Sequence, residues 1–416
     1  MTMTAEHSAV AEPMRESYAL KRQPEIEIGL LTGCQDRPYV FGLAMALAAK
    51  NVSVEIVGSD EEDSPEFHTA PLRFLNLRGS VQSQSIKFKK MAGLLAYYAR
   101  LLRYATTTKA PIFHVLWNNR LEYLDRTLLM LYFKALGKKI ALTAHNVNIA
   151  RRDGNDSWLN RMTLRFQYRV VDHLFVHTEK MKSELAGEYG VREDAITVIT
   201  HPINDAFPDT DLTSLQAKQR LGLKPREKAI LFFGRLRPYK GLEHLIQAFQ
   251  LLPQNSDYRL IIAGESKKGS EEYFENIQQM IGAEVATGRI LAKIEFIPDD
   301  EAEVYLKAAD VLVLPYKEIF QSGVLFLGYS FGLPAIATDV GSFHEAIVEG
   351  RTGFVARSCD PAELAAAIDQ YFASDLYRNL NIRRAELCEY AREHHSWAAA
   401  AELTVKAYAR LLETKR

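Results

Sequence analysis

The sequence is poor in cysteine and has no long apolar run. Cys34, Cys359 and Cys388 are the cysteines among its 416 residues, and their number and spacing exclude a disulfide framework or a cysteine zinc site. No apolar run approaches the roughly 20 residues that a membrane-spanning helix needs. The first residues contain acids and lack the apolar segment of a secretory signal. We therefore expect a soluble, cytoplasmic protein.

Net charge is also close to zero. The 51 Lys and Arg and 52 Asp and Glu residues leave a formal net charge of −1, so no overall field attracts nucleic acid. No G-x-G-x-x-G motif opens a strand-to-helix turn, which argues against an NAD-dependent enzyme. With 47% hydrophobic and 25% charged residues, the chain is ordinary for a globular protein but too long for one core. We therefore expect two domains.

Short apolar runs alternate with helical periods along the chain. Examples are "VSVEIVG", "IFHVLW" and "KIALTA" in the first half, and "AILFFG", "YRLIIAG" and "DVLVLP" in the second. Strands that are apolar on both faces are typical of parallel sheets covered by helices on both sides. The sequence therefore predicts an α/β protein with two facing, doubly wound domains.

A stretch rich in proline, asparagine and aspartate separates the two series of strands. It begins at His201. We expect a flexible tail over residues 1–22, a first domain over 23–205, a second domain over 206–393 and a C-terminal helix over 394–416.

The stretch "GRLRPYKG", from Gly234 to Gly241, concentrates positive charge where a predicted strand ends. Ligands of doubly wound sheets bind at the carboxyl ends of the strands. Gly234 permits close backbone approach, Arg235 offers a planar fork of donors, and Lys240 supplies a point charge at the start of a helix. These groups suit a phosphate or diphosphate. The alternative is that the cations are only solvated.

A second turn with free amides, "QSG", follows the predicted strand "DVLVLP" and precedes an apolar helix. Its residues are Gln321, Ser322 and Gly323, followed by Val324. A helix N-terminus attracts anions through its free amides and its partial positive charge. The alternative is that Ser322 is an ordinary N-cap. Because both turns fall in one domain, they predict one phosphate-binding crevice.

The second half of the sequence resembles the family 4 retaining glycosyltransferases of the GT-B fold (glycosyl transferases group 1). The resemblance runs from "LFFGRLRPYKGLEHLIQAF" to "GLPAIATDVGSFHEAIVEGRTGFV". It implies two Rossmann-like domains with a cleft between them, and transfer of a sugar from a nucleotide-sugar to an acceptor. It also implies that Arg235 and Lys240 hold the donor diphosphate, that the backbone of Ile297 receives the nucleobase, and that residues 322–324 meet the distal phosphate.

The first half is similar to the acceptor domain of the family in two places. "LLTGCQDRPYVFGLAMALAAKN" resembles its opening strand, glycine loop and helix, which puts Gly33 on the acceptor side. "LTAHNVN" resembles the strand end whose histidine faces the donor sugar, which assigns that role to His145 and an acceptor-side place to Asn146. The C-terminal residues resemble the helix that crosses back to the first domain. The alternative is that His145 is a buried or capping histidine.

One departure from the family concerns its two glutamates, which stand eight positions apart. Alignment on "GLP" puts Ile319 and Leu327 there, and Glu318 lies one residue early. We keep Glu318 as a donor-side residue and leave the sugar open.

The expected catalytic residues are thus His145, Arg235 and Lys240. Fixed cations and amides would stabilise the charge that grows on the leaving phosphate. The resemblance implies retention of configuration, with attack on the face that the leaving group departs from. Protein cations can replace a metal in this scheme, so we expect no cofactor and treat "DTD", Asp209–Asp211, as linker acids.

The predicted helix over residues 86–103 carries five basic residues and no acid, with apolar residues between them. Such helices favour anionic membrane surfaces, which would fit a lipid-linked acceptor. The alternative is a helix that covers the sheet with its cations in solvent.

Two other functions fit the same architecture. A nucleotide-sugar epimerase would turn over the donor with no acceptor, and a non-catalytic nucleotide-sugar binding protein would show neither transfer nor hydrolysis. Assays with and without acceptors separate them.

Overall fold

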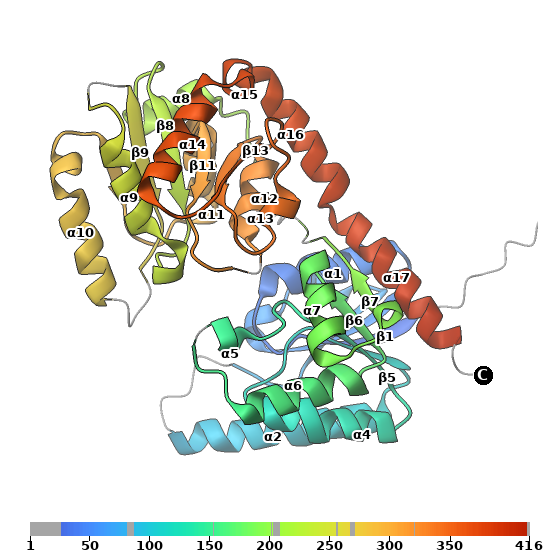
Figure 1. Cartoon of the computed structure of the whole chain (residues 1–416). Coiled ribbons are helices and arrows are strands. Elements are labelled where there is room, and N and C mark those ends of the chain that lie inside the picture. Colours follow the sequence, from blue (N-terminus) through green and yellow to red (C-terminus); the bar gives the residue numbers. More distant parts are fainter. Residues whose placement is uncertain are drawn as a thin grey trace, which may run out of the picture.

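The computed structural model of the protein describes residues 26–80, 87–152, 154–200, 202, 209–254, 257–266, 271–319 and 321–413. Two parallel sheets form two domains, one above the other in Figure 1. The expected tail over 1–22, and His201 with residues 203–208 of the stretch between the domains, lie outside the described residues. The prediction of two doubly wound α/β domains is confirmed.

The first sheet has seven strands in the order β3-β2-β1-β4-β5-β6-β7, all parallel. These are β1 (Glu27–Leu31), β2 (Ser53–Gly58), β3 (Leu72–Asn76), β4 (Ile112–Val115), β5 (Lys139–Thr143), β6 (His173–Val176) and β7 (Ile196–Val198). Every residue of β4 and β6 is buried, which explains their continuous apolar character.

Helices cover both faces of this sheet. One hydrophobic core joins the strands to α2 (Lys87–Thr107), α4 (Met130–Ala135), α6 (Trp158–Val170) and α7 (Glu179–Tyr189). The other joins them to α1 (Arg37–Ala49) and to α17 (Trp397–Glu413). The short helices are η1 (Asp60–Glu62), η2 (Pro65–His68), α3 (Glu122–Leu124), η3 (Asp125–Leu129), α5 (Ile149–Arg152) and η4 (Glu193–Ala195).

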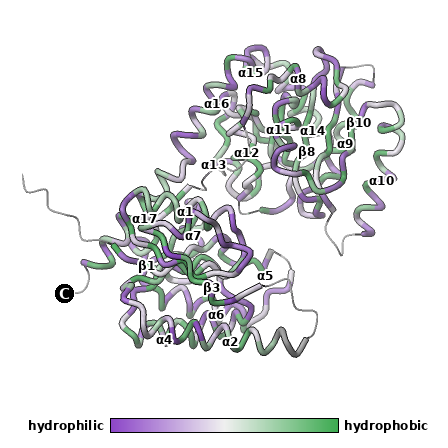
Figure 2. Tube along the Cα trace, turned by 180° about the vertical axis from the view of Figure 1, so that it is seen from behind, coloured by the Kyte–Doolittle hydropathy of each residue, from purple (hydrophilic) through white to green (hydrophobic). Residues whose placement is uncertain are grey.

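The second sheet has six parallel strands in the order β10-β9-β8-β11-β12-β13. These are β8 (Lys228–Phe233), β9 (Tyr258–Ala263), β10 (Ile290–Lys293), β11 (Val311–Leu314), β12 (Ala335–Thr338) and β13 (Gly353–Ala356). The helices are α8 (Ser214–Arg220), η5 (Pro238–Lys240), α9 (Leu242–Leu251), α10 (Glu271–Ala286), α11 (Asp299–Ala308), α12 (Gly323–Ser330), α13 (Phe343–Ala346), α14 (Pro361–Ala373), α15 (Asp375–Arg378) and α16 (Leu380–His394). Figure 2 shows hydrophobic residues gathered within each domain.

The chain returns to the first domain at its end (Figure 1). Helix α16 belongs to the second domain, whereas α17 packs against α1, β6 and β7 of the first. Gly42 of α1 makes this packing possible, since a Cβ there would lie 2.0 Å from Trp397. The Glu179 amide also donates to Glu345 Oε2 at 3.3 Å, which joins residues that follow β6 and β12. The carboxyl ends of the two sheets therefore face each other.

Candidate active site

Gly234 brings the two predicted phosphate loops of the second domain together. It follows β8 directly and has a φ of 99°, which favours glycine. A Cβ at this position would lie 3.2 Å from Lys240 Nζ and 3.4 Å from Val324 Cγ2. The loop after β8 and the first turn of α12 thus meet at one glycine.

Lys240 is buried at the end of η5, just before α9. Its Nζ lies 5.5 Å from the centroid of the Tyr316 ring. Burial, together with the charges of Arg237 and Arg235, lowers the pKa of Lys240 to about 8. Within the described residues no carboxylate pairs with this amine. A buried amine that lacks an acidic partner is costly to keep charged, and an anionic ligand would relieve that cost.

Arg235 occupies a different environment from Lys240. Its side chain is 66% exposed, and its Nε donates to Glu265 Oε1 at 2.8 Å. Glu265 follows β9, the neighbour of β8 in the sheet. A diphosphate at this edge would share Arg235 with Glu265 or displace it. The two cations predicted from one motif therefore differ in burial and in pairing: Lys240 is buried, whereas Arg235 is exposed and paired with an acid.

The N-terminus of α12 is open. Ser322 is buried at the N-cap position, but its side chain makes no capping hydrogen bond. A Cβ on Gly323 would meet no atom of the described residues within 4 Å. Gln321 Oε1 is buried and has no hydrogen-bond partner among the described residues. The amides in the first turn of α12 can therefore bind a ligand, and the Ser322 hydroxyl does not cap the helix.

The positions of the missing family glutamates are apolar because they belong to the core. Leu327 is buried, and Ile319 packs against the same cluster. Glu318 is exposed in the loop between β11 and α12. The side chain of Ile297, between β10 and α11, is also buried in this cluster. The structure therefore offers no acidic side chain at 319 or 327.

His145 lies after β5 in the first domain and is held by aromatic rings. It stacks on Trp117, with centroids 4.1 Å apart and an interplanar angle of 3°. The edge-on ring of Tyr39 lies 4.7 Å away between centroids. His145 Nδ1 lies 3.1 Å from His177 Nε2, and His177 Nδ1 lies 3.0 Å from the carbonyl oxygen of Ile199.

This hydrogen-bond chain sets the tautomer of His145. A carbonyl oxygen only accepts, so His177 Nδ1 donates to Ile199. The Nε2 of a neutral His177 then accepts from the Nδ1–H of His145. The lone pair of His145 is left on Nε2, which can accept a hydrogen bond from a hydroxyl group. The ring is oriented by groups that follow β4 and β6 on either side of β5.

Gly33 and Asn146, which are expected from the sequence on the acceptor side, border the same aromatic group. Gly33 follows β1 with a φ of 66°, and a Cβ there would lie 2.6 Å from the carbonyl oxygen of Trp117. Asn146 is half-buried next to His145. Both therefore lie where β1, β4 and β5 end.

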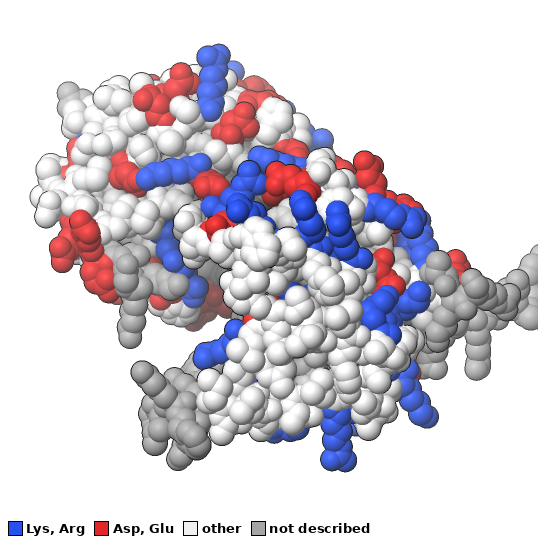
Figure 3. Space-filling view, turned by 60° about the horizontal axis from the view of Figure 1, so that its bottom comes forward, with Lys and Arg blue, Asp and Glu red and all other residues white. Residues whose placement is uncertain are grey.

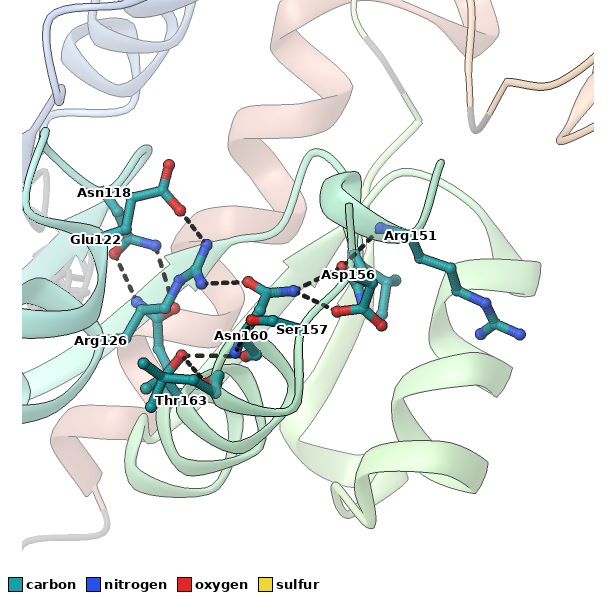
Figure 4. Close-up of polar contacts among 12 residues, drawn as sticks. Asn118, Glu122, Arg126, Arg151, Asp156, Ser157, Asn160 and Thr163 are labelled. Atoms are coloured by element: carbon teal, nitrogen blue, oxygen red, sulfur yellow. Dashed lines mark hydrogen bonds and ion pairs between the residues drawn. The ribbon is translucent and has the colours of Figure 1, made fainter. Parts of the chain in front are cut away.

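A cavity of about 220 Å³ opens beside His145 and is lined by amide side chains. Asn118 and Gln167 exchange hydrogen bonds of 3.2 and 2.7 Å. Arg126 Nη1 donates to Asn160 Oδ1 at 2.7 Å, and Asn160 Nδ2 donates to Asn148 Oδ1 at 3.0 Å (Figure 4). Amides both donate and accept, so this lining matches a ligand that carries several hydroxyl groups.

The lining of this cavity was not predicted from the sequence. A continuous helix fits the apolar period of residues 121–137, but the structure has a π-helical turn, η3, between α3 and α4. That turn contains Arg126, which is buried and paired with Glu122. Polar residues on one helix face, such as Asn160 and Gln167 seven positions apart, were the available signal.

The "DTD" residues take part in contacts of the protein itself. Asp209 Oδ1 lies 2.8 Å from Lys307 Nζ, and the Thr210 amide donates to Glu303 Oε1 at 2.7 Å. Across the described part of the chain, no three His, Cys, Asp or Glu side chains gather as metal ligands.

Two family models match the chain. The model described as glycosyl transferases group 1 matches residues 214–394, and the model described as Glycosyltransferase Family 4 matches residues 38–207. The D-inositol 3-phosphate glycosyltransferase of Corynebacterium aurimucosum is 30% identical over 249 residues, 57% of this chain and 56% of that protein. Its namesake from Corynebacterium diphtheriae is 29% identical over 287 residues, 64% of each chain. The match spans between about half and two thirds of these relatives.

Solved structures share the two-domain architecture. Sucrose-phosphate synthase from Thermosynechococcus elongatus superimposes with a TM-score of 0.74 at 20% identity, over 94% of this chain and 100% of that one. Anabaena HepE in complex with UDP and glucose gives a TM-score of 0.69 at 14% identity, over 92% and 98% of the two chains. These likenesses show the GT-B fold. With one family model on each domain, the chain belongs to the glycosyl transferases group 1 of glycosyltransferase family 4.

Proposed function

We propose that the protein is a retaining, metal-independent glycosyltransferase. It moves a sugar from a nucleoside-diphosphate sugar to a sugar or lipid-linked acceptor, in the synthesis of a polysaccharide or glycoconjugate. The observation that carries this proposal is the buried Lys240, which has no acidic partner among the described residues, beside Gly234 and the N-terminus of α12. Relatives named as glycosyltransferases, and a neighbour of the same fold solved with UDP, support it.

The second domain binds the donor in this proposal. Lys240, Arg235 and the first amides of α12 meet the diphosphate, where negative charge grows as the sugar leaves. Ile297 contributes its backbone to the nucleobase, and Gln321 and Glu318 lie in the loop toward the sugar. Because 319 and 327 are apolar, we assign no protein nucleophile. The acceptor oxygen attacks from the face of the leaving phosphate, and a donor phosphate oxygen takes its proton.

The first domain binds the acceptor in this proposal. His145 Nε2 accepts a hydrogen bond from a sugar hydroxyl, and Asn146 and the amide-lined cavity bind the acceptor hydroxyls. A peripheral membrane contact through residues 86–103 belongs to the same proposal, because a lipid-linked acceptor lies at a membrane surface. Closure of the two domains would bring donor and acceptor together.

The direct test is a panel of UDP-, GDP- and ADP-sugars, each incubated with and without sugar and lipid-linked acceptors. Release of free nucleoside diphosphate with formation of an acceptor product is the expected result. A change of the sugar without any acceptor would point to an epimerase. Nucleotide binding with neither transfer nor hydrolysis would point to a sensor, and either result would overturn the proposal.

Nucleotide binding is expected to weaken as the pH rises above about 8. The pKa of Lys240 is lowered from 10.5 to about 8, so the free protein loses this positive charge at a pH where ordinary lysines keep it. A diphosphate favours the charged amine, so above this pH each complex must take up a proton, which costs up to about tenfold in affinity per pH unit. Calorimetric titration with nucleoside diphosphates below and above pH 8 measures the effect.

Lys240→Ala is the control for this pH dependence. The affinity of this variant for nucleoside diphosphate should be lower and show no inflection near pH 8. A wild-type affinity that stays constant through pH 8 would contradict the role of Lys240 in nucleotide binding.

The lowered pKa of Lys240 also has a consequence for folding, because the unfolded chain holds the extra proton between pH 8 and 10.5. The folded state therefore gains stability as the pH rises through that window.

Chelation with EDTA is expected to leave most transfer activity. The amine of Lys240 and the amides of α12 stabilise the leaving group in place of a divalent ion, and Asp209 is engaged by Lys307. Initial transfer rates with EDTA, and after addition of Mg²⁺ or Mn²⁺, provide the measurement. Complete loss of activity with recovery on metal addition would instead assign a metal to the site.

A further inference from the structure

Residues 87–170 of the first domain combine positive charge with exposed apolar side chains. This stretch holds sixteen Lys and Arg but four Asp and Glu, an excess of twelve positive charges in a chain whose formal net charge is −1. Of the 21 large hydrophobic side chains that are exposed in the described residues, thirteen fall within it. They are Met91, Leu95, Leu102, Leu121, Tyr123, Leu124, Leu128, Leu131, Leu136, Ile149, Trp158, Leu159 and Met162.

The helices that carry these side chains lie next to one another on the same face of the first sheet. Helices α2, α4 and α6 share one hydrophobic core with that sheet (Figure 1). The Tyr132 hydroxyl of α4 donates to the carbonyl oxygen of Leu102 in α2 at 3.3 Å. On the other side, Arg126 of η3 donates to Asn160 of α6. We call the outer surface of these helices the basal face.

Each helix of the basal face carries a second apolar stripe, separate from the one packed on the sheet. In α2, Tyr97, Leu101 and Tyr104 are buried. Leu95, by contrast, is 60% exposed. The η3 residue Leu128 is 63% exposed. Trp158, at the start of α6, is 68% exposed. An apolar surface of this extent on one face marks an interaction site.

Cations surround the apolar stripes. Arg100 and Arg103 of α2 are exposed and line a hollow of about 580 Å³ together with Arg73 and Lys109. Glu55 in this hollow is already paired with Arg73 at 3.1 Å. Figure 3 shows the basal face turned forward, with Lys and Arg side chains around a broad uncharged surface. Apolar side chains with cations at their margin match the boundary between the headgroups and acyl chains of an anionic bilayer.

We propose that the basal face docks on the surface of an anionic phospholipid membrane. The charge argues against a second copy of the chain as the occupant, because the stretch that supplies this face holds many more Lys and Arg than Asp and Glu, and two such faces would repel each other. In the described part of the chain no helix is long and apolar enough to cross a bilayer, so α2, α4 and α6 lie on the membrane. Basic residues, predicted on the helix over residues 86–103, thus extend from α2 to α4 and α6.

The basal face also adjoins the amide-lined cavity. Ile149, exposed at the start of α5, and Glu122 of α3 line that cavity. If the cavity binds the acceptor, which rests on the proposed function, docking places the acceptor cavity close to the bilayer surface. A lipid-linked acceptor would then reach the cavity without leaving the membrane.

Co-sedimentation of the full-length protein with vesicles tests the docking. Binding is expected to vesicles of phosphatidylcholine mixed with phosphatidylglycerol, and to be at least about tenfold weaker with phosphatidylcholine alone. Because surface charges act through a screened field, added salt should weaken binding further. Equal binding to both kinds of vesicle, or to neither, would overturn the proposal.

Matched variants separate docking through the basal face from nonspecific binding of exposed apolar side chains to vesicles. The double variant Leu128→Glu, Leu131→Glu changes exposed side chains of η3 and α4 and should lower vesicle binding at least about tenfold. The control double variant Leu251→Glu, Ile382→Glu changes side chains of the second domain that are 62% and 66% exposed, and should bind like wild type. Thermal melts check that both fold. Equal loss in both variants would overturn the proposal.

Two further measurements distinguish the alternatives. If wild type is a dimer by analytical ultracentrifugation, the Leu128→Glu, Leu131→Glu variant a monomer, and neither binds vesicles, the basal face is a self-association surface and the proposal is wrong. Vesicle binding needs no donor or acceptor, so it stands or fails separately from the glycosyltransferase activity. Transfer to a water-soluble acceptor should stay unchanged in the basal-face variant.

Discussion

Replacing Lys240 with alanine is expected to lower the rate of sugar transfer by about 100- to 1,000-fold, as loss of one fixed donor at a developing oxyanion does. The amine is buried beside Gly234 and Val324, where the leaving diphosphate would lie. Water cannot replace a charge at such a position without reopening the packed site. Initial rates at saturating donor, together with kcat/KM for the donor, measure the effect.

Arg235→Ala and Lys317→Ala are the comparisons for Lys240→Ala. Arg235 is 66% exposed and already bound to Glu265, so its loss should cost less than that of Lys240. Lys317 follows β11 in the same domain but pairs with Glu243, and its loss should change transfer little. All three variants should melt near the wild-type temperature. For Lys240→Ala the reason is that burying the charge of Lys240 lowers the stability of the folded state, so its removal does not destabilise the protein. Full transfer activity of Lys240→Ala would contradict the proposal that Lys240 contacts the donor diphosphate.

His145→Ala is expected to reduce turnover strongly while nucleoside-diphosphate affinity stays close to wild type. The imidazole lies in the first domain, whereas the groups that we propose contact the diphosphate lie in the second. Its Nε2, which carries the lone pair set by the chain through His177, is buried in this structure, so it would meet a sugar hydroxyl only after the rearrangement that accompanies domain closure. The loss should therefore fall on kcat, by about 100-fold or more for a group that acts in the transition state.

Calorimetry of nucleotide binding and initial transfer rates on the same His145→Ala preparation separate the two effects. His68→Ala is the control, because His68 is an exposed histidine of the same domain that pairs with Asp63. His177→Gln tests the orientation of the ring and should lower kcat less than His145→Ala. Unchanged turnover in His145→Ala, or a loss confined to nucleotide affinity, would make His145 a structural residue.

The donor side of the site could be predicted from the sequence because its groups are close together along the chain. "GRLRPYKG" and "QSG" each follow an apolar strand, and the end of such a strand is where a doubly wound sheet binds ligands. The different environments of Arg235 and Lys240 could not be predicted. Glu265 follows the neighbouring strand β9, and the burial of Lys240 depends on α12 packing over Gly234.

The sequence alone determined the two α/β domains and the edge of each sheet where a ligand is expected, because strands buried on both faces must be apolar throughout. Only the tertiary structure decided how the residues assigned to the acceptor side come together. Gly33, Trp117, His145 and His177 follow β1, β4, β5 and β6, which are neighbours in the sheet but far apart along the chain. The contacts among these residues depend on the order of the strands in the sheet, and so do the contacts of Arg126 and Asn160. Local patterns of hydrophobicity do not indicate that order.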